Sequence, residues 1–135
     1  MSEKYCNECG TSYGVEKHHI ISRKQVKPLE DCKHVFVYLC YKHHRDHKTG
    51  VHFNRALYLK YKLQFQNYLE THLLKEFLTR EEIKEVLEIK DKPLDRLLSS
   101  LILHKGKYAR EDVILACMAK KKVTEEDILE LEGEK

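Results

Sequence analysis

The spacing of cysteines and histidines constrains this chain more than any other feature. Two pairs, each with two intervening positions, are Cys6-x-x-Cys9 and Cys40-x-x-His43, and seven of the nine histidines fall between residues 18 and 52. Neither an apolar core nor a solvated surface favours such a concentration, whereas thiolate and neutral imidazole are ligands that zinc prefers. The pattern therefore predicts an N-terminal unit organised around metal.

The two pairs predict one closed zinc site. Each gap of two residues lets both side chains of a tight turn reach the same ion, and three cysteines with one histidine form a known tetrahedral set. Zinc would add stability that a small unit cannot obtain from its core. Cys32 is an alternative ligand, although it lacks a partner at the right spacing, and Cys117 is expected in a helix core. The competing interpretation is that the cysteines are merely buried as small apolar side chains.

The other histidines predict a second, open metal site. His18 and His19 are adjacent on an expected strand, so their side chains point to opposite sides and only one of them readily binds a given ion. His44 follows the zinc ligand His43 on an expected helix, so it points away from the zinc and can meet His18. Two imidazoles on one ion leave coordination positions open, as catalytic sites do. His47 lies three residues further on and is another candidate ligand. His19, left free of metal, suits a general base because a free imidazole titrates near neutral pH.

The N-terminal half has clear signals of strand and helix. Residues 16–21 are expected to end a strand, residues 22–33 form a basic loop, and residues 35–39 are a β-branched and aromatic run typical of a strand. A short helix is expected over 40–48, stopped by a glycine. Asn54 is expected to cap a long helix. Its apolar stripe has three- and four-residue spacing and consists of Leu57, Tyr61, Phe65, Tyr68, Leu69 and Leu73, with Tyr58, Lys60 and Lys62 off that stripe.

The last third is expected to be helical. Thr79 to Glu82 matches a capping box, and Lys92-Pro93 ends that helix or begins the next. A second apolar stripe, expected to close near Gly106, comprises Leu94, Leu97, Leu98, Leu101 and Ile102. A third helix is expected around Val113, Ile114, Cys117 and Met118, and Thr124 begins a fourth. A helix-turn-helix is one interpretation. A small bundle packed on the first unit or on a second copy is favoured, because Arg96, Lys105 and Lys107 are few for a groove-binding face.

The combined motifs resemble those of a known family. Cys-x-x-Cys, then Glu-x-His-His-Ile, then Leu-Cys-x-x-His-His is similar to the HNH (ββα-metal) endonucleases over roughly residues 6–70, and within them to small phage-encoded members. The resemblance implies that His19 is the base that activates water and that His18 and His44 bind the catalytic ion, which would be Mg²⁺, Mn²⁺, Ni²⁺ or Zn²⁺. It also implies that Cys6, Cys9, Cys40 and His43 bind the structural Zn²⁺.

One departure from the family pattern bears on activity. The asparagine that normally stands a few residues before the Leu-Cys pair, and braces the loop carrying the base, is missing. The chain has Lys33-His34-Val35-Phe36 there. Either His34 takes over the brace, or the nuclease is weak or inactive and serves for binding. The narrower phage group also lacks the asparagine, which favours activity.

Charge supports a phosphate-bearing partner. Residues 1–62 hold 12 lysines and arginines against 6 acidic residues, whereas residues 63–135 hold 13 against 16. The resemblance implies hydrolysis of DNA phosphodiesters, and basic side chains could then hold the DNA backbone. The candidates for those contacts are Arg23, Lys24, Lys27, Arg45 and Lys48. The alternative is an inactive zinc-containing module that binds DNA or protein.

The expected fold is α+β: a zinc-bound ββα-metal domain over 1–62, a connecting helix over 63–78, and a small helical bundle over 79–135. The partners expected are DNA, a second copy through the C-terminal helices, or another protein. No apolar run approaches the roughly 20 residues of a membrane helix. Five cysteines without a secretory signal indicate a reducing cytoplasm, that of a bacterial host if the chain is phage-encoded.

Overall fold

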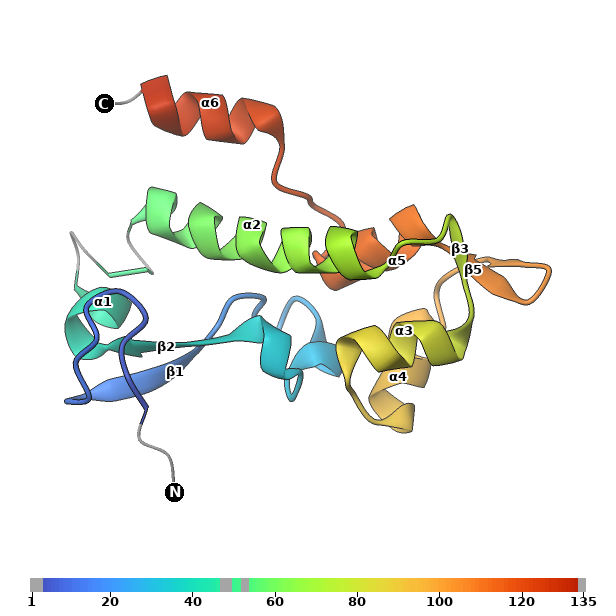
Figure 1. Cartoon of the computed structure of the whole chain (residues 1–135), viewed down its shortest axis with the longest axis horizontal. Coiled ribbons are helices and arrows are strands. Elements are labelled where there is room, and N and C mark those ends of the chain that lie inside the picture. Colours follow the sequence, from blue (N-terminus) through green and yellow to red (C-terminus); the bar gives the residue numbers. More distant parts are fainter. Residues whose placement is uncertain (1–3, 47–49, 52–53, 134–135) are drawn as a thin grey trace.

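Two antiparallel strands followed by a short helix form the N-terminal part of the fold. The computed structural model describes residues 4–46, 50–51 and 54–133. Strands β1 (Val15–His19) and β2 (Phe36–Cys40) pair so that His18 lies opposite Val37. Helix α1 (Tyr41–Arg45) begins directly after β2 (Figure 1). The strand and short helix expected here are present, with β2 shifted by one residue and α1 ending at Arg45 before an extended Asp46, earlier than the expected end near residue 48.

The basic segment between the strands is packed rather than loose. It contains two 3₁₀ turns, η1 (Lys27–Leu29) and η2 (Lys33–Val35). Four apolar residues at three-residue spacing are buried along it, namely Val26, Leu29, Cys32 and Val35. This spacing suits 3₁₀ geometry, in which side chains three apart lie on one side. The basic side chains therefore project from a fixed backbone.

The long helix α2 (Arg55–His72) runs beside the strands and links both halves of the chain (Figure 1). The Asn54 side chain accepts a hydrogen bond from the backbone N–H of Leu57 at 3.1 Å, which confirms the expected cap. One continuous cluster of buried side chains extends from Cys6 to Met118 across this helix. The connecting helix expected over 63–78 therefore begins earlier, at Arg55, and ends at His72, so the expected boundary between residues 62 and 63 lies inside α2.

The C-terminal third contains a sheet that the sequence analysis did not anticipate. Its elements are β3 (Phe77–Leu78), α3 (Arg80–Leu87), α4 (Asp91–Leu98), β4 (Leu103–His104), β5 (Lys107–Ala109) and α5 (Arg110–Cys117). The strand order is β3-β5-β4, with both pairs antiparallel. Strands of two or three residues are too short to show an alternating pattern, so an all-helical bundle was the wrong expectation.

The caps of this region agree with the sequence, whereas one helix end does not. Thr79 and Glu82 form the expected capping box at the start of α3. Helix α4 ends at Leu98 rather than near Gly106, and Ile102 beyond it is 68% exposed. Lys105 and Gly106 both have left-handed backbones and form the two-residue turn of the β4–β5 hairpin. The glycine therefore turns a hairpin and does not close a helix.

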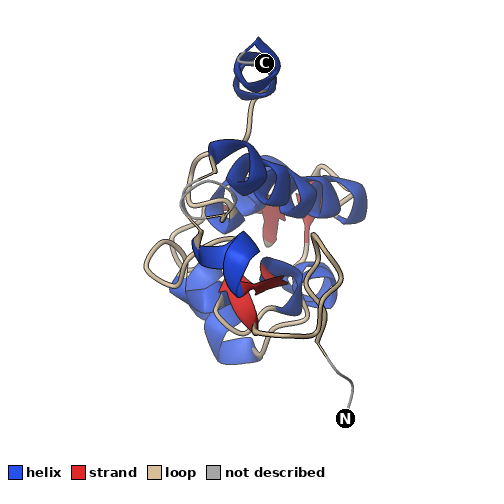
Figure 2. Cartoon of the chain, turned by 90° about the vertical axis from the view of Figure 1, so that its left-hand side faces the viewer, coloured by secondary structure: helices blue, strands red, loops and turns tan. Residues whose placement is uncertain are grey.

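The C-terminal helices pack on the N-terminal part of the chain. Leu94, Leu97 and Leu98 of α4 are buried, and α4 contacts η1. Helix α6 (Glu125–Gly133) begins after Thr124, as expected, and lies apart from the other helices (Figure 2). Of the helices described, none has both the length and the apolar character needed to cross a lipid bilayer.

Candidate metal centres and a histidine pocket

The four residues of the predicted zinc site lie together. Nδ1 of His43 is 3.3 Å from Sγ of Cys40 and 3.7 Å from Sγ of Cys6, and the Sγ atoms of Cys9 and Cys40 are 3.8 Å apart. All four ligand atoms lie within 4.8 Å of one another. Tetrahedral zinc with Zn–S of about 2.3 Å and Zn–N of about 2.0 Å separates its ligands by roughly 3.5–3.8 Å. The donor set and its spacing therefore fit one metal ion.

Backbone hydrogen bonds prepare Cys6 to bind metal as a thiolate. Burial opposes its ionisation, but N–H groups of Cys40, Cys9 and Glu8 favour the charged form, and the net effect lowers the pKa of Cys6 to about 6. The tight turn that carries it is closed by Gly10, whose N–H donates to the carbonyl of Cys6 at 2.9 Å. Thiolate character is what zinc requires of a cysteine ligand.

The Cys6–Cys9 turn is fixed to β2 and to α2. The N–H of Asn7 donates to the carbonyl of Tyr38 in β2 at 2.8 Å. From α2, Tyr61 donates its hydroxyl to the Glu8 carboxylate, and Nζ of Lys60 lies 2.9 Å from the same group. Contacts with β2 and α2 thus hold the turn that carries Cys6 and Cys9 in place.

The two remaining cysteines belong to the core. Cys32 is buried, and its thiol donates to the carbonyl of Leu87 at 3.3 Å. It is therefore not the alternative zinc ligand that the sequence left open. Cys117 is fully buried on α5, and burial raises the pKa of its thiol. The interpretation of Cys117 as a core residue is confirmed.

His18 and His44 face each other across the strand–helix gap. Their ring centroids are 5.1 Å apart with an edge-on geometry, and both residues are 8% exposed. Nδ1 of His44 lies 3.1 Å from the Glu16 carboxylate, which is also held by the Arg45 guanidinium through two contacts of 2.9 Å. The Arg45 guanidinium and then His44 hold the pKa of Glu16 below its usual range. Since a carboxylate only accepts, Nδ1 carries the proton and Nε2 keeps its lone pair.

His19 lies on the opposite face of β1 and has a different partner. Its Nε2 is 2.9 Å from the backbone carbonyl of Glu30, and its ring rests edge-on against Phe36 at 4.8 Å. A carbonyl oxygen only accepts hydrogen bonds, so Nε2 carries the proton and Nδ1 keeps the lone pair in the neutral ring. Such a ring is oriented to accept a proton at Nδ1.

His34 does not brace the loop that contacts His19. Its Nε2 lies 2.6 Å from the Glu88 carboxylate, and its ring stacks on Tyr68 at 4.0 Å. The Glu30 backbone is instead held by η1, where its N–H donates to the carbonyl of Lys27 at 3.1 Å. Among the described contacts, none joins His34 to His19 or Glu30. Of the two alternatives for the missing asparagine, a brace supplied by His34 therefore finds no support in these contacts.

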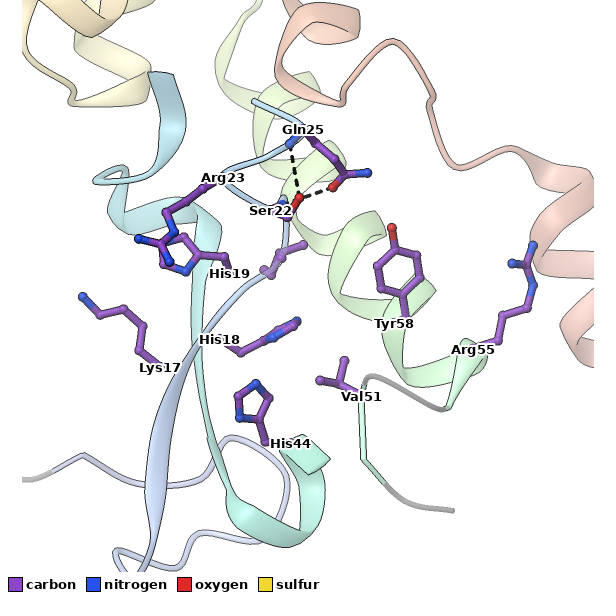
Figure 3. A pocket seen from close by; sticks show the side chains of 11 residues that line it. Lys17, His18, His19, Ser22, Arg23, Gln25, His44, Val51, Arg55 and Tyr58 are labelled. Atoms are coloured by element: carbon purple, nitrogen blue, oxygen red, sulfur yellow. Dashed lines mark hydrogen bonds between the residues drawn. The ribbon is translucent and has the colours of Figure 1, made fainter. Parts of the chain in front are cut away.

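One cavity brings the three site histidines together. It has a volume of about 580 Å³ and lies where β1, α1 and α2 meet (Figure 3). Its described lining contains no acidic side chain and consists of Lys17, His18, His19, Ile20, Ser22, Arg23, Gln25, His44, Val51, Arg55 and Tyr58. The combination of imidazole rings and cationic groups suits an anionic substrate.

The predicted DNA contacts differ in how far the structure supports them. Arg23 lines the cavity, and Lys24 is exposed in the same segment. Lys27 is exposed but pairs with Glu30 at 2.8 Å. Arg45 is engaged by Glu16 and therefore positions His44 rather than offering a free charge. His47 and Lys48 lie outside the described residues.

Several lining residues were missed by the sequence analysis. Lys17, Gln25, Arg55 and Tyr58 reach the cavity from β1, the basic segment and α2. Their positions depend on how α2 packs, for which a local pattern gives no signal. The position of Glu16 could have been predicted, because residues two apart on a strand share a face and Glu16 precedes His18 by two.

None of the protein-family models, curated proteins or solved structures compared with this chain matches it. Two features of the structure therefore bear on function. One is the Cys₃His cluster of ligand atoms, and the other is the cationic cavity lined by His44, the residue that follows His43 on α1.

Proposed function

We propose that this chain is a metal-dependent nuclease that hydrolyses DNA phosphodiester bonds, of the HNH type that its motifs resemble. The observation that carries the proposal is the cavity in which His19, with a bare Nδ1, adjoins the His18–His44 pair. A general base and a pair of metal-binding imidazoles in one cationic site are what phosphodiester hydrolysis requires.

The roles of the side chains follow from their hydrogen bonds. His19 would take the proton of the attacking water on Nδ1, while the Glu30 carbonyl stabilises the imidazolium that forms. Arg23, Lys17 and Arg55 would hold the phosphate and its neighbours. A divalent ion bound by His18 and His44 would supply positive charge against the phosphate and the leaving oxygen. Imidazole ligands favour Zn²⁺ or Ni²⁺ over Mg²⁺ at such a site.

The Cys₃His cluster would hold a structural Zn²⁺ with no open position. Its role would be to fix the junction of β2 and α1, because Cys40 ends the strand and His43 belongs to the helix. His44 is the next residue, so its direction depends on this junction. Phage origin, a second copy and a cytoplasmic location stay predictions from the sequence.

The test is cleavage of supercoiled plasmid DNA with Mg²⁺, Mn²⁺, Ni²⁺ or Zn²⁺ added in turn. His19→Ala should lose cleavage by about 10²–10⁴-fold while keeping zinc content and DNA affinity, because a base acts on water and not on binding. His72→Ala, an exposed histidine of α2 outside the cavity, is the matched control. Cleavage by His19→Ala at the wild-type rate would refute the assigned base.

A second candidate function is a zinc-containing module that binds DNA without cutting it. The observation that favours it is the engagement of His34 by Glu88 and Tyr68, which leaves the position of the family asparagine without a brace for the base loop. The two candidates separate in one experiment. Tight DNA binding with no cleavage in any of the four metals would favour the binding module.

A further inference from the structure

A second cavity adjoins the histidine pocket. It has a volume of about 230 Å³ and lies between α2 and the segment that connects α5 to α6. Gln25, Arg55 and Tyr58 line both cavities, so the two are neighbours along one surface. The described lining is completed by Leu59, Lys62, Met118, Ala119, Lys121, Lys122, Val123 and Asp127.

Lys62 is the unusual member of this lining. It is 5% exposed, although lysine is rarely buried without a partner. The contact that the structure gives for its ammonium group is the face of the Tyr58 ring, with Nζ 5.5 Å from the ring centroid. No carboxylate of the described residues pairs with it. Because Lys62 lines the cavity, an anion bound there would supply the missing counter-charge for this ammonium group.

The balance of the other charges is also positive. Lys121 is exposed at the rim, and Arg55 lies 3.9 Å from the single acidic group of the lining, Asp127. The Asp127 carboxylate is held by the N–H and hydroxyl of Thr124. The charge of Lys122 is balanced by Glu111 at 3.1 Å and Glu70 at 3.6 Å. Lys122 therefore helps to hold the α5–α6 connection and is not counted as a ligand contact.

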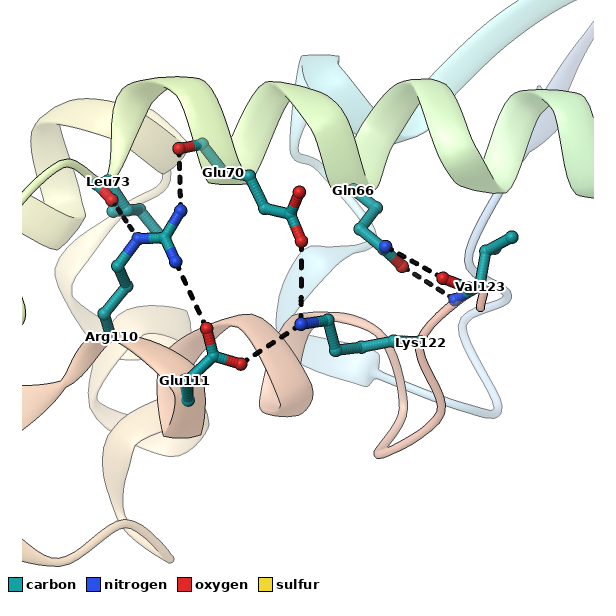
Figure 4. Close-up of polar contacts among 7 residues, drawn as sticks. All are labelled: Gln66, Glu70, Leu73, Arg110, Glu111, Lys122 and Val123. Carbon is teal, nitrogen blue, oxygen red and sulfur yellow. Dashed lines mark hydrogen bonds and ion pairs between the residues drawn. The ribbon is translucent and has the colours of Figure 1, made fainter. Parts of the chain in front are cut away.

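The wall that carries the lysines is held in place by α2 (Figure 4). The buried amide of Gln66 makes two hydrogen bonds to the backbone of Val123, of 2.7 and 3.0 Å. Ala119 and Lys120 both adopt left-handed backbones with φ of 55° and 65°. Such conformations cost free energy for residues other than glycine, so surrounding contacts must hold them. The cavity is therefore preformed.

We propose that this second cavity binds a phosphate group of the same nucleic-acid strand whose phosphodiester lies in the histidine pocket. Lys62 makes the central contact, with Arg55 and Lys121 beside it. The identity of the ligand as nucleic acid rests on the proposed function, whereas the anion site itself rests on the Lys62 ammonium group, which lines the cavity without a carboxylate partner among the described residues. The site would extend the contact surface from the N-terminal part of the chain to the α5–α6 connection.

The test compares Lys62→Met with Lys84→Met, a matched change on α3 at a residue that pairs with Asp91. Methionine keeps the aliphatic stem and removes the charge. Binding of a fluorescently labelled DNA duplex is measured by anisotropy over a range of salt, with no divalent ion added. Lys62→Met should bind roughly tenfold more weakly near 0.1 M salt and lower the salt slope by about 1, as loss of one phosphate contact predicts. Lys84→Met should match the wild type.

A second measurement uses inorganic phosphate as the probe. Phosphate should raise the melting temperature of the wild type and of Lys84→Met, but not that of Lys62→Met, because ligand binding stabilises the folded state. Equal phosphate shifts in all three proteins, with unchanged DNA affinity in Lys62→Met, would overturn the second site. If the wild type nevertheless cuts DNA, the proposed nuclease function is unaffected by that result. Loss of DNA affinity in Lys62→Met without any cleavage by the wild type would instead refute the nuclease and support the anion site.

Discussion

Two adjacent histidines on α1 should fail in different ways when each is replaced by alanine. His43 contributes Nδ1 to the Cys₃His cluster, with Cys40 Sγ at 3.3 Å. His44 points instead to Glu16 and to the ring of His18. His43→Ala should therefore lower zinc content and stability. His44→Ala should keep the zinc and most of the stability, and should raise the divalent-metal concentration needed for cleavage because it removes a ligand from the proposed open site.

The magnitudes of the two losses are far enough apart to measure. A structural zinc site contributes about 10–16 kcal/mol in small peptides, which is comparable to the whole stability of a domain at about 5–15 kcal/mol. Loss of one ligand should lower the melting temperature by more than about 10 °C. His44→Ala removes one hydrogen bond to a carboxylate that retains Arg45. That change costs about 1 kcal/mol, or roughly 3–5 °C for a chain of this size.

The assay combines calorimetric melting, elemental zinc analysis and metal titrations of cleavage. Zinc should stay near one per chain in His44→Ala and fall in His43→Ala. Equal losses of stability and zinc from both substitutions would mean that one metal cluster includes both histidines. In that case the chain is better described as a structural zinc module, and the nuclease proposal would be withdrawn.

Two further predictions concern residues that hold the two candidate metal sites, and a third concerns the capping box of α3. Cys9→Ser should make the N-terminal part sensitive to protease and lower the zinc content from about one per chain, since metal binding there is part of folding. Protein purified without zinc yet fully folded would contradict this. Glu16→Gln should raise the divalent-metal concentration needed for cleavage by about 10–100-fold at unchanged zinc, because it removes the carboxylate that orients His44. An unchanged metal titration would contradict it. The Lys75 ammonium and the Thr79 backbone lower the pKa of Glu82 to about 2 from 4.5. A carboxyl group with a lowered pKa stabilises the fold at a pH above its pKa in the unfolded chain, and this stabilisation is lost as the pH falls towards its pKa in the folded chain. The difference in melting temperature between wild type and Glu82→Gln should therefore close towards pH 2. A difference that is constant with pH would refute the linkage.

Features set by neighbouring residues could be predicted from the sequence. The caps at Asn54 and Thr79 depend on contacts within four residues, and both are present. The pairs of metal ligands depend on the reach of one turn, and they meet as expected. The alternation of His18 and His19 follows from strand geometry.

Features set by packing could not be predicted in this way. Lys62 falls off the apolar stripe of α2, yet it is almost fully buried, on a side of the helix that faces the α5–α6 connection. The contact of His34 with Glu88 joins residues 54 positions apart. The β4–β5 hairpin has too few residues to show its alternation. In each case the partner comes from a distant segment that no local pattern identifies.

A step of one residue separates two different roles twice in this fold. On β1, the pleat turns His18 towards His44 and His19 towards the Glu30 carbonyl. On α1, the helical step turns His43 into the Cys₃His cluster and His44 into the cavity. Because Cys40 and His43 lie on either side of the β2–α1 junction, the proposed zinc would set the angle at which His44 meets His18. A structural ion at this junction would thus control the geometry of the open site through a single peptide unit, without touching the substrate.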